Sequence, residues 1–192
     1  MPPSNWRKLF HVLAGSIIPV MGIFVSSQIM VNVLLVISGL AILSETARFT
    51  SPSINKGLVR LFKPLLKPAD VYQVTSATYM VIAALGCFLL FDKSIAVAAL
   101  LFLSVGDPVA SLTGIRMSGF RIGKKSPRGS IAFFIVTICL SLVLWGMGIA
   151  HPLWALIIGG AVATSVELAP VPLDDNATIP LVSGAAISIL PI

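Results

Sequence analysis

The sequence predicts an all-helical protein, a polytopic bundle of about seven transmembrane helices that forms one domain over residues 1–192. The first observation is composition: 57% of the residues are hydrophobic and 10% are charged, whereas charged residues make up about 25% of a typical soluble domain. The second is that apolar residues fall into separate segments, each close to the ~20 residues that a membrane-spanning helix needs. The third is that basic residues gather between alternate segments.

The seven expected spans cover roughly residues 9–26, 29–47, 71–91, 94–115, 130–150, 152–170 and 177–192. The first is the weakest, because it contains Gly15, Ser16 and Pro19 and follows two basic residues, as a signal peptide would. No small-x-small cleavage site follows it and the second span begins almost at once, so we expect it to be retained. No linker or repeat divides the chain. Cys87 and Cys139 lie inside apolar segments, as core residues rather than a disulfide.

Lysine and arginine residues orient the bundle. If the seven spans alternate, Lys93 lies alone on one side and every other basic residue lies on the opposite side. Those residues are Arg7, Lys8, Arg48, Lys56, Arg60, Lys63, Lys67, Arg116, Arg121, Lys124, Lys125 and Arg128. The positive-inside rule makes that side cytoplasmic, which predicts a multi-pass protein of the cell membrane with its N-terminus inside and its C-terminus outside. Topology and anionic headgroups then explain the net charge of +6, and nucleic acid is not expected as a partner.

Acidic residues gather on the same side, which topology does not require, and Asp92 alone lies on the other. Asp107 is the most informative of them, because a carboxylate inside a span costs at least ~2–3 kcal/mol unless it faces a polar cavity or a partner. Ser104 and Ser111 share its helix face, at spacings of three and four residues. We expect Asp107 to be a functional carboxylate; a single buried polar contact between helices is the alternative.

A glycine-rich basic loop, SGFRIGKKSPRGS at 118–130, follows the span that contains Asp107. The next span begins on the cytoplasmic side, so its unpaired backbone amides and the positive end of its dipole face this loop. Gly123, Gly129 and the pair Lys124–Lys125 can therefore cradle phosphate groups. The spacing is one residue too short for a Walker A loop. An ordinary cytoplasmic loop, whose charges only set the topology, is the alternative.

Gly106, Ala110 and Gly114 recur every four residues on the span that contains Asp107. Such a stripe of small residues lets a second helix approach closely. Packing is therefore the expected role of all three, with contact to a ligand also open for Gly114.

A third cluster, ELAPVPLDDNATIPL at 167–181, carries four oxygen-bearing side chains. Glu167 ends the sixth span, and Asp174, Asp175 and Asn176 precede the seventh. Oxygen ligands of this kind suit Mg²⁺, which usually takes one or two carboxylates together with substrate phosphates. Capping of the last helix by Asp175 or Asn176 is the alternative, and it would account for one of the four residues.

Two smaller groups are open to more than one interpretation. His11 can share a helix face with Arg7 and Lys8, either as a satisfied interfacial histidine or as a catalytic group. Glu45 and Arg48 lie three residues apart at the end of the second span. They can form a structural ion pair, or they can take part in the site.

The order of these motifs resembles that of a known family. RK-x-x-H, E-x-x-R, GD-P-x-A-x-x-x-G, G-K-K-S-x-x-G-S and E…DN-x-x-IPL-x-SG follow one another from Arg7 to Gly184. This order resembles the CTP-dependent lipid-alcohol kinases, which comprise dolichol (polyprenol) kinases, phytol kinases and fungal-type diacylglycerol kinases and are distantly related to phosphatidate cytidylyltransferases. Eukaryotic dolichol kinases have many more spans, so the chain resembles their catalytic core.

The resemblance implies CTP as phosphoryl donor, Mg²⁺ as cofactor and a lipid alcohol in the membrane as acceptor. The residues that match the family's nucleotide-binding motif are Asp107, Gly114, Gly123, Lys124, Lys125, Ser126, Gly129 and Ser130. Arg7 and Lys8 match its basic N-terminal pair, and Asp175–Asn176 match its last acidic motif. The lipid alcohol, the preference for CTP over ATP and the oligomeric state are left open.

The expected mechanism is phosphoryl transfer at the cytoplasmic face, with catalytic roles for Asp107, Glu167, Asp175, Lys124 and Lys125. Asp107 and one of Glu167 and Asp175 would hold Mg²⁺, while Lys124 and Lys125 neutralise developing charge. Glu167 or Asp175 would take the hydroxyl proton, with His11 a weaker candidate. Two alternatives are synthesis of a CDP-lipid, as by phosphatidate cytidylyltransferases, and a small cation- or proton-coupled transporter with Asp107 and Glu167 as a relay.

Overall fold

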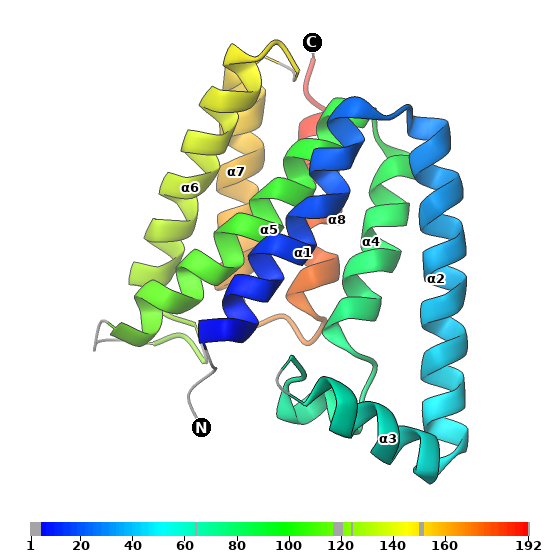
Figure 1. Cartoon of the computed structure of the whole chain (residues 1–192). Coiled ribbons are helices and arrows are strands. Elements are labelled where there is room, and N and C mark those ends of the chain that lie inside the picture. Colours follow the sequence, from blue (N-terminus) through cyan, green and yellow to red (C-terminus); the bar gives the residue numbers. More distant parts are fainter. Residues whose placement is uncertain (1–4, 64, 117–120, 124, 150–151, 192) are drawn as a thin grey trace.

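The computed structural model describes residues 5–63, 65–116, 121–123, 125–149 and 152–191. Helices dominate these ranges, and no strand occurs in them beyond a single bridge between Ile122 and Lys125. The elements are α1 (Asn5–Phe24), α2 (Ser27–Thr50), α3 (Pro52–Phe62), the 3-10 turn η1 (Pro68–Val71), α4 (Ser76–Leu90), α5 (Lys93–Arg116), α6 (Pro127–Gly146), α7 (Leu153–Leu168) and α8 (Asp175–Ser188) (Figure 1).

The predicted all-helical class is confirmed, and a helix lies at each of the seven expected segments. Within the described residues, three helices are long and apolar enough to cross a membrane: α2, α5 over Lys93–Ile115, and α6. Shorter apolar helices cover His11–Phe24, Ser76–Leu90 and Leu153–Leu168. The length and apolar composition of these helices indicate a membrane protein. The count of seven spans and their orientation stay predictions.

Local sequence signals set the helix ends. Ser26 and Thr75 cap α2 and α4 by accepting a hydrogen bond from a backbone amide three residues on. Proline opens α3 and α6, where its missing N–H costs nothing. Asp174 caps α8 by accepting from the Asn176 amide, so the cap is one residue earlier than Asp175 or Asn176. Asp175 is thereby left in the first turn, with its carboxylate available for other contacts.

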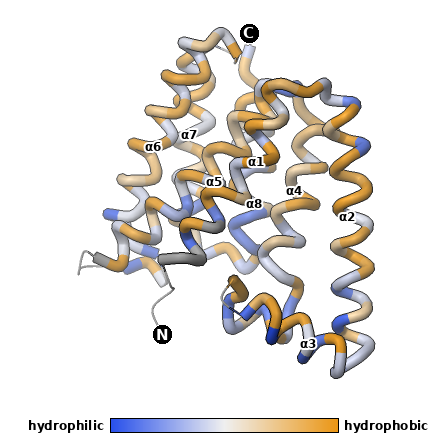
Figure 2. The backbone as a smooth tube through the Cα atoms, in the orientation of Figure 1, coloured by the Kyte–Doolittle hydropathy of each residue, from blue (hydrophilic) through white to orange (hydrophobic). Residues whose placement is uncertain are grey.

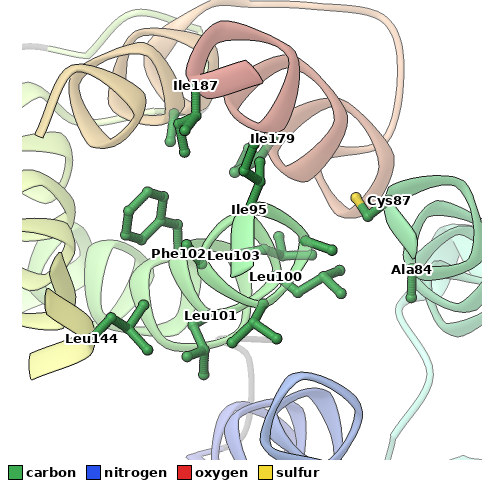
Figure 3. Close-up of a cluster of buried hydrophobic side chains, with 14 of the residues drawn as sticks. Ala84, Cys87, Ile95, Leu100, Leu101, Phe102, Leu103, Leu144, Ile179 and Ile187 are labelled. Atoms are coloured by element: carbon green, nitrogen blue, oxygen red, sulfur yellow. The ribbon is translucent and has the colours of Figure 1, made fainter. Parts of the chain in front are cut away.

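Helix α5 is the centre of the bundle, and α1, α4, α6, α7 and α8 pack around it (Figure 1). Figure 3 shows its buried side chains Phe102 and Leu103 between Ile179 and Ile187 of α8 and Leu144 of α6. The predicted packing role of the small-residue stripe is confirmed, because a Cβ at Gly106 would lie 2.7 Å from the Phe133 ring of α6. Helix α2 packs only at the edge, against α3 and α4.

Among the described residues, the hydrophilic segments lie mainly toward the two ends of the bundle, and those at the start of α8 reach further inward (Figure 2). Asp92 and Lys93 lie at one end, where Lys93 Nζ donates to the carbonyls of Ile23 (3.0 Å) and Val25 (2.9 Å). The other end, here called the site end, carries the start of α1, α3, the C-termini of α2, α5 and α7 and the N-termini of α4, α6 and α8 (Figure 1). The one-sidedness predicted for the charges is therefore present in the fold, and the side of the membrane that this end faces stays a prediction.

Candidate functional site

The site end contains a cavity of about 890 Å³ to which all eight α-helices contribute. It brings together most of the sequence-predicted residues: Lys8, His11, Glu45, Arg48, Asp107, Gly114, Lys125, Ser126, Gly129, Glu167, Asp175 and Asn176. Ser130 lies behind the wall, against Glu167, and Gly123 forms a turn rather than a wall. Lys124 and the side chain of Arg7 lie outside the described residues.

Lys125 lies between two of the predicted carboxylates. Its Nζ is 3.3 Å from Glu167 Oε1 and forms an ion pair with Asp175 Oδ2. The Ser130 hydroxyl donates to the other oxygen of Glu167, at 2.6 Å. These four residues, here called the Lys125 cluster, join the loop before α6 to the end of α7 and the start of α8.

A tight turn places Lys125 in this position. Ile122 and Lys125 exchange two backbone hydrogen bonds of 3.0 Å, with Gly123 at φ +60° between them. A positive φ favours glycine, so the turn explains this residue without a ligand. Burial disfavours a charged Lys125, but the carboxylates of Asp175, Glu167 and Asp107 outweigh burial and raise the pKa of Lys125. The lysine therefore stays protonated at neutral pH.

Asp107 lines the same cavity from α5 and is half-buried there. Its carboxylate is near enough to Lys125 to favour the charged form of the lysine. His11 of α1 also lines the cavity, and its Nε2 is buried without a hydrogen-bond partner among the described residues. The cavity is thus lined both by a carboxylate, from Asp107, and by an imidazole, from His11.

The glycines of the loop have packing reasons of their own. A Cβ at Gly129 would lie 2.6 Å from the carbonyl oxygen of Ala110, and one at Gly114 would lie 3.1 Å from the Ser126 Cβ. These contacts are where α6 approaches α5, so close packing alone requires the small residue at 129. The nucleotide-binding roles of Gly114 and Gly129 stay predictions.

Among the described residues, the oxygen-bearing side chains do not form a preformed metal cage. Within the described part of the chain, no three acidic, histidine or cysteine side chains converge as a metal site would require. Asn176 Nδ2 donates to Asp174 Oδ1 at 2.7 Å, while Asn176 Oδ1 is buried with no partner among the described residues. An unused amide oxygen beside Asp175 suits Mg²⁺, which takes few protein ligands when substrate phosphates supply the others.

Glu45 and Arg48 form a buried structural clamp, here called the Glu45–Arg48 clamp. Arg48 Nη2 is 2.6 Å from Glu45 Oε2, and the guanidinium also donates to the carbonyls of Asp70 and Gln73. The other oxygen of Glu45 accepts from the Thr75 amide and the Thr78 hydroxyl, each at 3.0 Å. Because these groups are used in holding η1 and the residues that follow it against α2 and α4, the contacts favour the structural interpretation of the pair.

Sequence reasoning missed one wall of the cavity. Five apolar residues of α3 and of the segment after it line the cavity: Leu58, Val59, Phe62, Leu65 and Leu66. The signal was present, because apolar side chains recur at 54, 58, 61 and 62 on a segment that begins with proline. The role of Asp174 in tying this wall to α8 was also missed. It lies 3.6 Å from Lys67 Nζ and accepts from the Ser76 hydroxyl at 3.3 Å.

Comparison with known proteins gives one relative of similar length. An uncharacterized protein of Rickettsia prowazekii (strain Madrid E) is 26% identical over 181 residues, which cover 91% of this chain and 88% of the relative. No family model matches the chain, and no solved structure matches it.

Proposed function

We propose that the protein is a membrane-embedded lipid kinase that transfers the γ-phosphate of CTP to the hydroxyl of a lipid alcohol, with Mg²⁺. The observation that carries the proposal is the make-up of a single cavity. Its lining contains Asp107, Lys125, Glu167 and Asp175, and it also contains the apolar residues of α3 and of the segment that follows it. A phosphoryl donor needs charged residues and a lipid acceptor needs apolar ones, and the reaction requires both in the same cavity.

The chain's own groups have distinct tasks in the proposed reaction. The lipid hydroxyl oxygen attacks the γ-phosphorus, a new O–P bond forms, and the bond to the β–γ bridging oxygen breaks to leave CDP. Lys125 pairs with Glu167 and Asp175 in the absence of a nucleotide. In the reaction its ammonium leaves these carboxylates and binds phosphate oxygens, whose negative charge it offsets. Glu167 or Asp175, once released from Lys125, accepts the proton of the hydroxyl. Asp107 and one of these carboxylates hold Mg²⁺, which would offset charge on the triphosphate.

The placement of the charges supports a one-sided reaction rather than transport. The carboxylates that line the cavity lie at the site end. The charged residues described at the far end are Asp92 and Lys93. A relay for a cation or proton needs polar groups along the whole path. In the proposed orientation the site end faces the cytoplasm, where CTP is available.

CTP labelled in its γ-phosphate tests the reaction directly. The purified protein in liposomes is incubated with this CTP, Mg²⁺ and a membrane lipid extract, and labelled products are separated. Label on a lipid supports the kinase, whereas label in pyrophosphate indicates CDP-lipid synthesis. If no label moves and CTP–Mg²⁺ does not bind, the kinase proposal fails and a transporter becomes the better explanation.

Asp107→Asn is the matching variant. It keeps the size and polarity of the side chain, so we expect normal insertion and purification with most of the transfer lost. Asp92→Asn makes the same change at the far end of the bundle and should keep full activity. Full transfer by Asp107→Asn would remove this residue from the mechanism.

A further inference from the structure

Helices α1 and α2 separate toward the site end, although they follow each other in the chain. Figure 1 shows them meeting at the far end, near residues 25–26, and diverging from there. Contacts with other helices hold them apart. A Cβ at Gly15 would lie 3.2 Å from the Ser104 Cβ of α5, and the Ser16 and Ser104 hydroxyls are 3.1 Å apart. Helix α2 is held instead to α4, through the Glu45–Arg48 clamp.

The space between the two helices is part of the cavity. Ala14 of α1 and Ala41 of α2 line it on opposite sides, and Met80 and Val81 of α4 line it as well. We call the part lined by these four residues the α1–α2 wedge. Alanines at 14 and 41 do not fill the gap that the diverging helices leave, so the space stays open. The wedge is continuous with the charged region around Asp107 and Lys125.

The apolar character of the wedge continues along both helices toward the middle of the bundle. Ile17 and Met21 follow Ala14 on α1, at spacings of three and seven residues, and both are exposed. Ile37 and Val33 precede Ala41 on α2, at four and eight residues, and they are exposed too. Apolar side chains on the same helix faces therefore lead from the wedge along the outside of the bundle.

We infer that the α1–α2 wedge seats the hydrocarbon chain of the lipid acceptor, which reaches the cavity sideways from the membrane between α1 and α2. The inference rests on the proposed function, and it names the place and the route of the acceptor. An amphiphile fits because the apolar wedge ends at the charged Lys125 cluster, so its polar head meets the cluster while its chain lies between the helices.

Width favours a hydrocarbon chain over a helix of another protein as the occupant. A helix with its side chains is about 10–12 Å wide, and a single hydrocarbon chain is much thinner. An extended chain can therefore lie between α1 and α2 and leave the region around Asp107 to polar groups.

Photo-crosslinking tests the wedge without relying on activity. Two probes are used on the full-length protein in liposomes, a long-chain isoprenoid alcohol and a diacylglycerol, each with a diazirine in a hydrocarbon chain. Ala41→Trp places an indole in the wedge. Leu43→Trp makes a similar change about 200° around α2, at a position that is 66% exposed. We expect at least one probe to label the wedge-lining residues of α1 and α2, with competition by its unlabelled parent lipid.

Ala41→Trp should lower the competed labelling about tenfold, which is the loss expected when an affinity falls by ~1.4 kcal/mol, and Leu43→Trp should leave it unchanged. Ala14→Leu narrows the wedge from the opposite side and replaces Ala41→Trp if that variant is not folded. Equal labelling of the Ala41 and Leu43 variants would overturn the inference. So would a lack of competed labelling in the wedge with both probes.

The outcomes separate this inference from the proposed function. Competed labelling in the wedge without phosphoryl transfer would support the lipid site in the wedge and would contradict the proposed kinase activity. Phosphoryl transfer with labelling elsewhere on the bundle keeps the kinase and removes the wedge as the acceptor site.

Discussion

Lys125, in the loop that leads into α6, lies 3.3 Å from Glu167 at the end of α7. The same ammonium pairs with Asp175, so one lysine joins three segments that are distant in the sequence. Two carboxylates that share a partly buried position repel each other unless a cation stands between them. Lys125 is therefore both the structural counter-charge of this corner and, in the proposed reaction, the group that phosphate oxygens displace.

Replacing Lys125 by methionine keeps most of the apolar stem and removes the charge. Lys125→Met should lower the free energy of unfolding by about 1–3 kcal/mol, at the low end of a buried pair because the side chain is 23% exposed. Thermal unfolding in detergent measures the effect. Lys56→Met, on the exposed side of α3, is the matched control and should change little. A stability of Lys125→Met equal to that of the control would show that the pair contributes nothing measurable.

The pKa of Lys125 predicts slow reaction with amine-acylating reagents. Burial favours the neutral amine, but the carboxylates outweigh it and raise the pKa above its ordinary value of about 10.4. A raised folded-state pKa means that the stabilisation is complete below the ordinary value and is lost only as pH rises through the folded value. At pH about 9, acylation of Lys125 should be slower than that of Lys56, as read by peptide mass spectrometry. Asp175→Asn should speed it up; an unchanged rate in that variant would contradict the assignment.

Substitution of Gly129 distinguishes a role in helix packing from a role in binding phosphate. In Gly129→Ala the new Cβ would lie 2.6 Å from the Ala110 carbonyl, so α5 and α6 would have to move apart. We expect a loss of about 1–3 kcal/mol in unfolding free energy, as for overpacked cores. Gly146→Ala, on the same helix with nothing within 4 Å, should be neutral or slightly stabilising. An unchanged melting temperature with lost CTP binding would instead show that Gly129 serves the nucleotide.

The helices could be predicted because each apolar run matches the length of one helix, and the gathering of the site followed from the sidedness of the charges. Sidedness, however, does not tell which residues touch. Nothing in the spacing of Lys125, Glu167 and Asp175 reveals that the lysine stands between the carboxylates, because that contact depends on how α6, α7 and α8 pack around α5.

Helix α3 was missed for a different reason. The positive-inside rule by itself accounts for its basic residues Lys56 and Arg60. The apolar residues between them, Leu58 and Val59, form no run long enough to indicate a span. An amphipathic helix has no continuous apolar run, so a search for spans passes over it. The cap of α8 shows the usual uncertainty at a helix end, since Asp174, Asp175 and Asn176 are all good capping residues and packing decides among them.

Arg48→Lys tests whether the Glu45–Arg48 clamp holds the α3–η1 segment in place. A guanidinium can donate at once to Glu45 and to the carbonyls of Asp70 and Gln73, whereas an ammonium lacks the planar fork that reaches all three. We expect backbone hydrogen exchange to rise in 52–62 and 68–75 and to stay constant in α5.

Arg60→Lys is the control for this experiment, because it makes the same replacement on the exposed part of α3 and should leave exchange unchanged. The overall loss of stability for Arg48→Lys should be about 1–3 kcal/mol, since buried carbonyls and one carboxylate oxygen lose a charged donor. Since α3 contributes apolar residues to the cavity lining, a loosened segment should weaken the binding of the acceptor lipid more than that of CTP. If exchange in 52–75 does not change, the clamp is not what positions α3, and a ligand-contacting role for Arg48 becomes the better explanation.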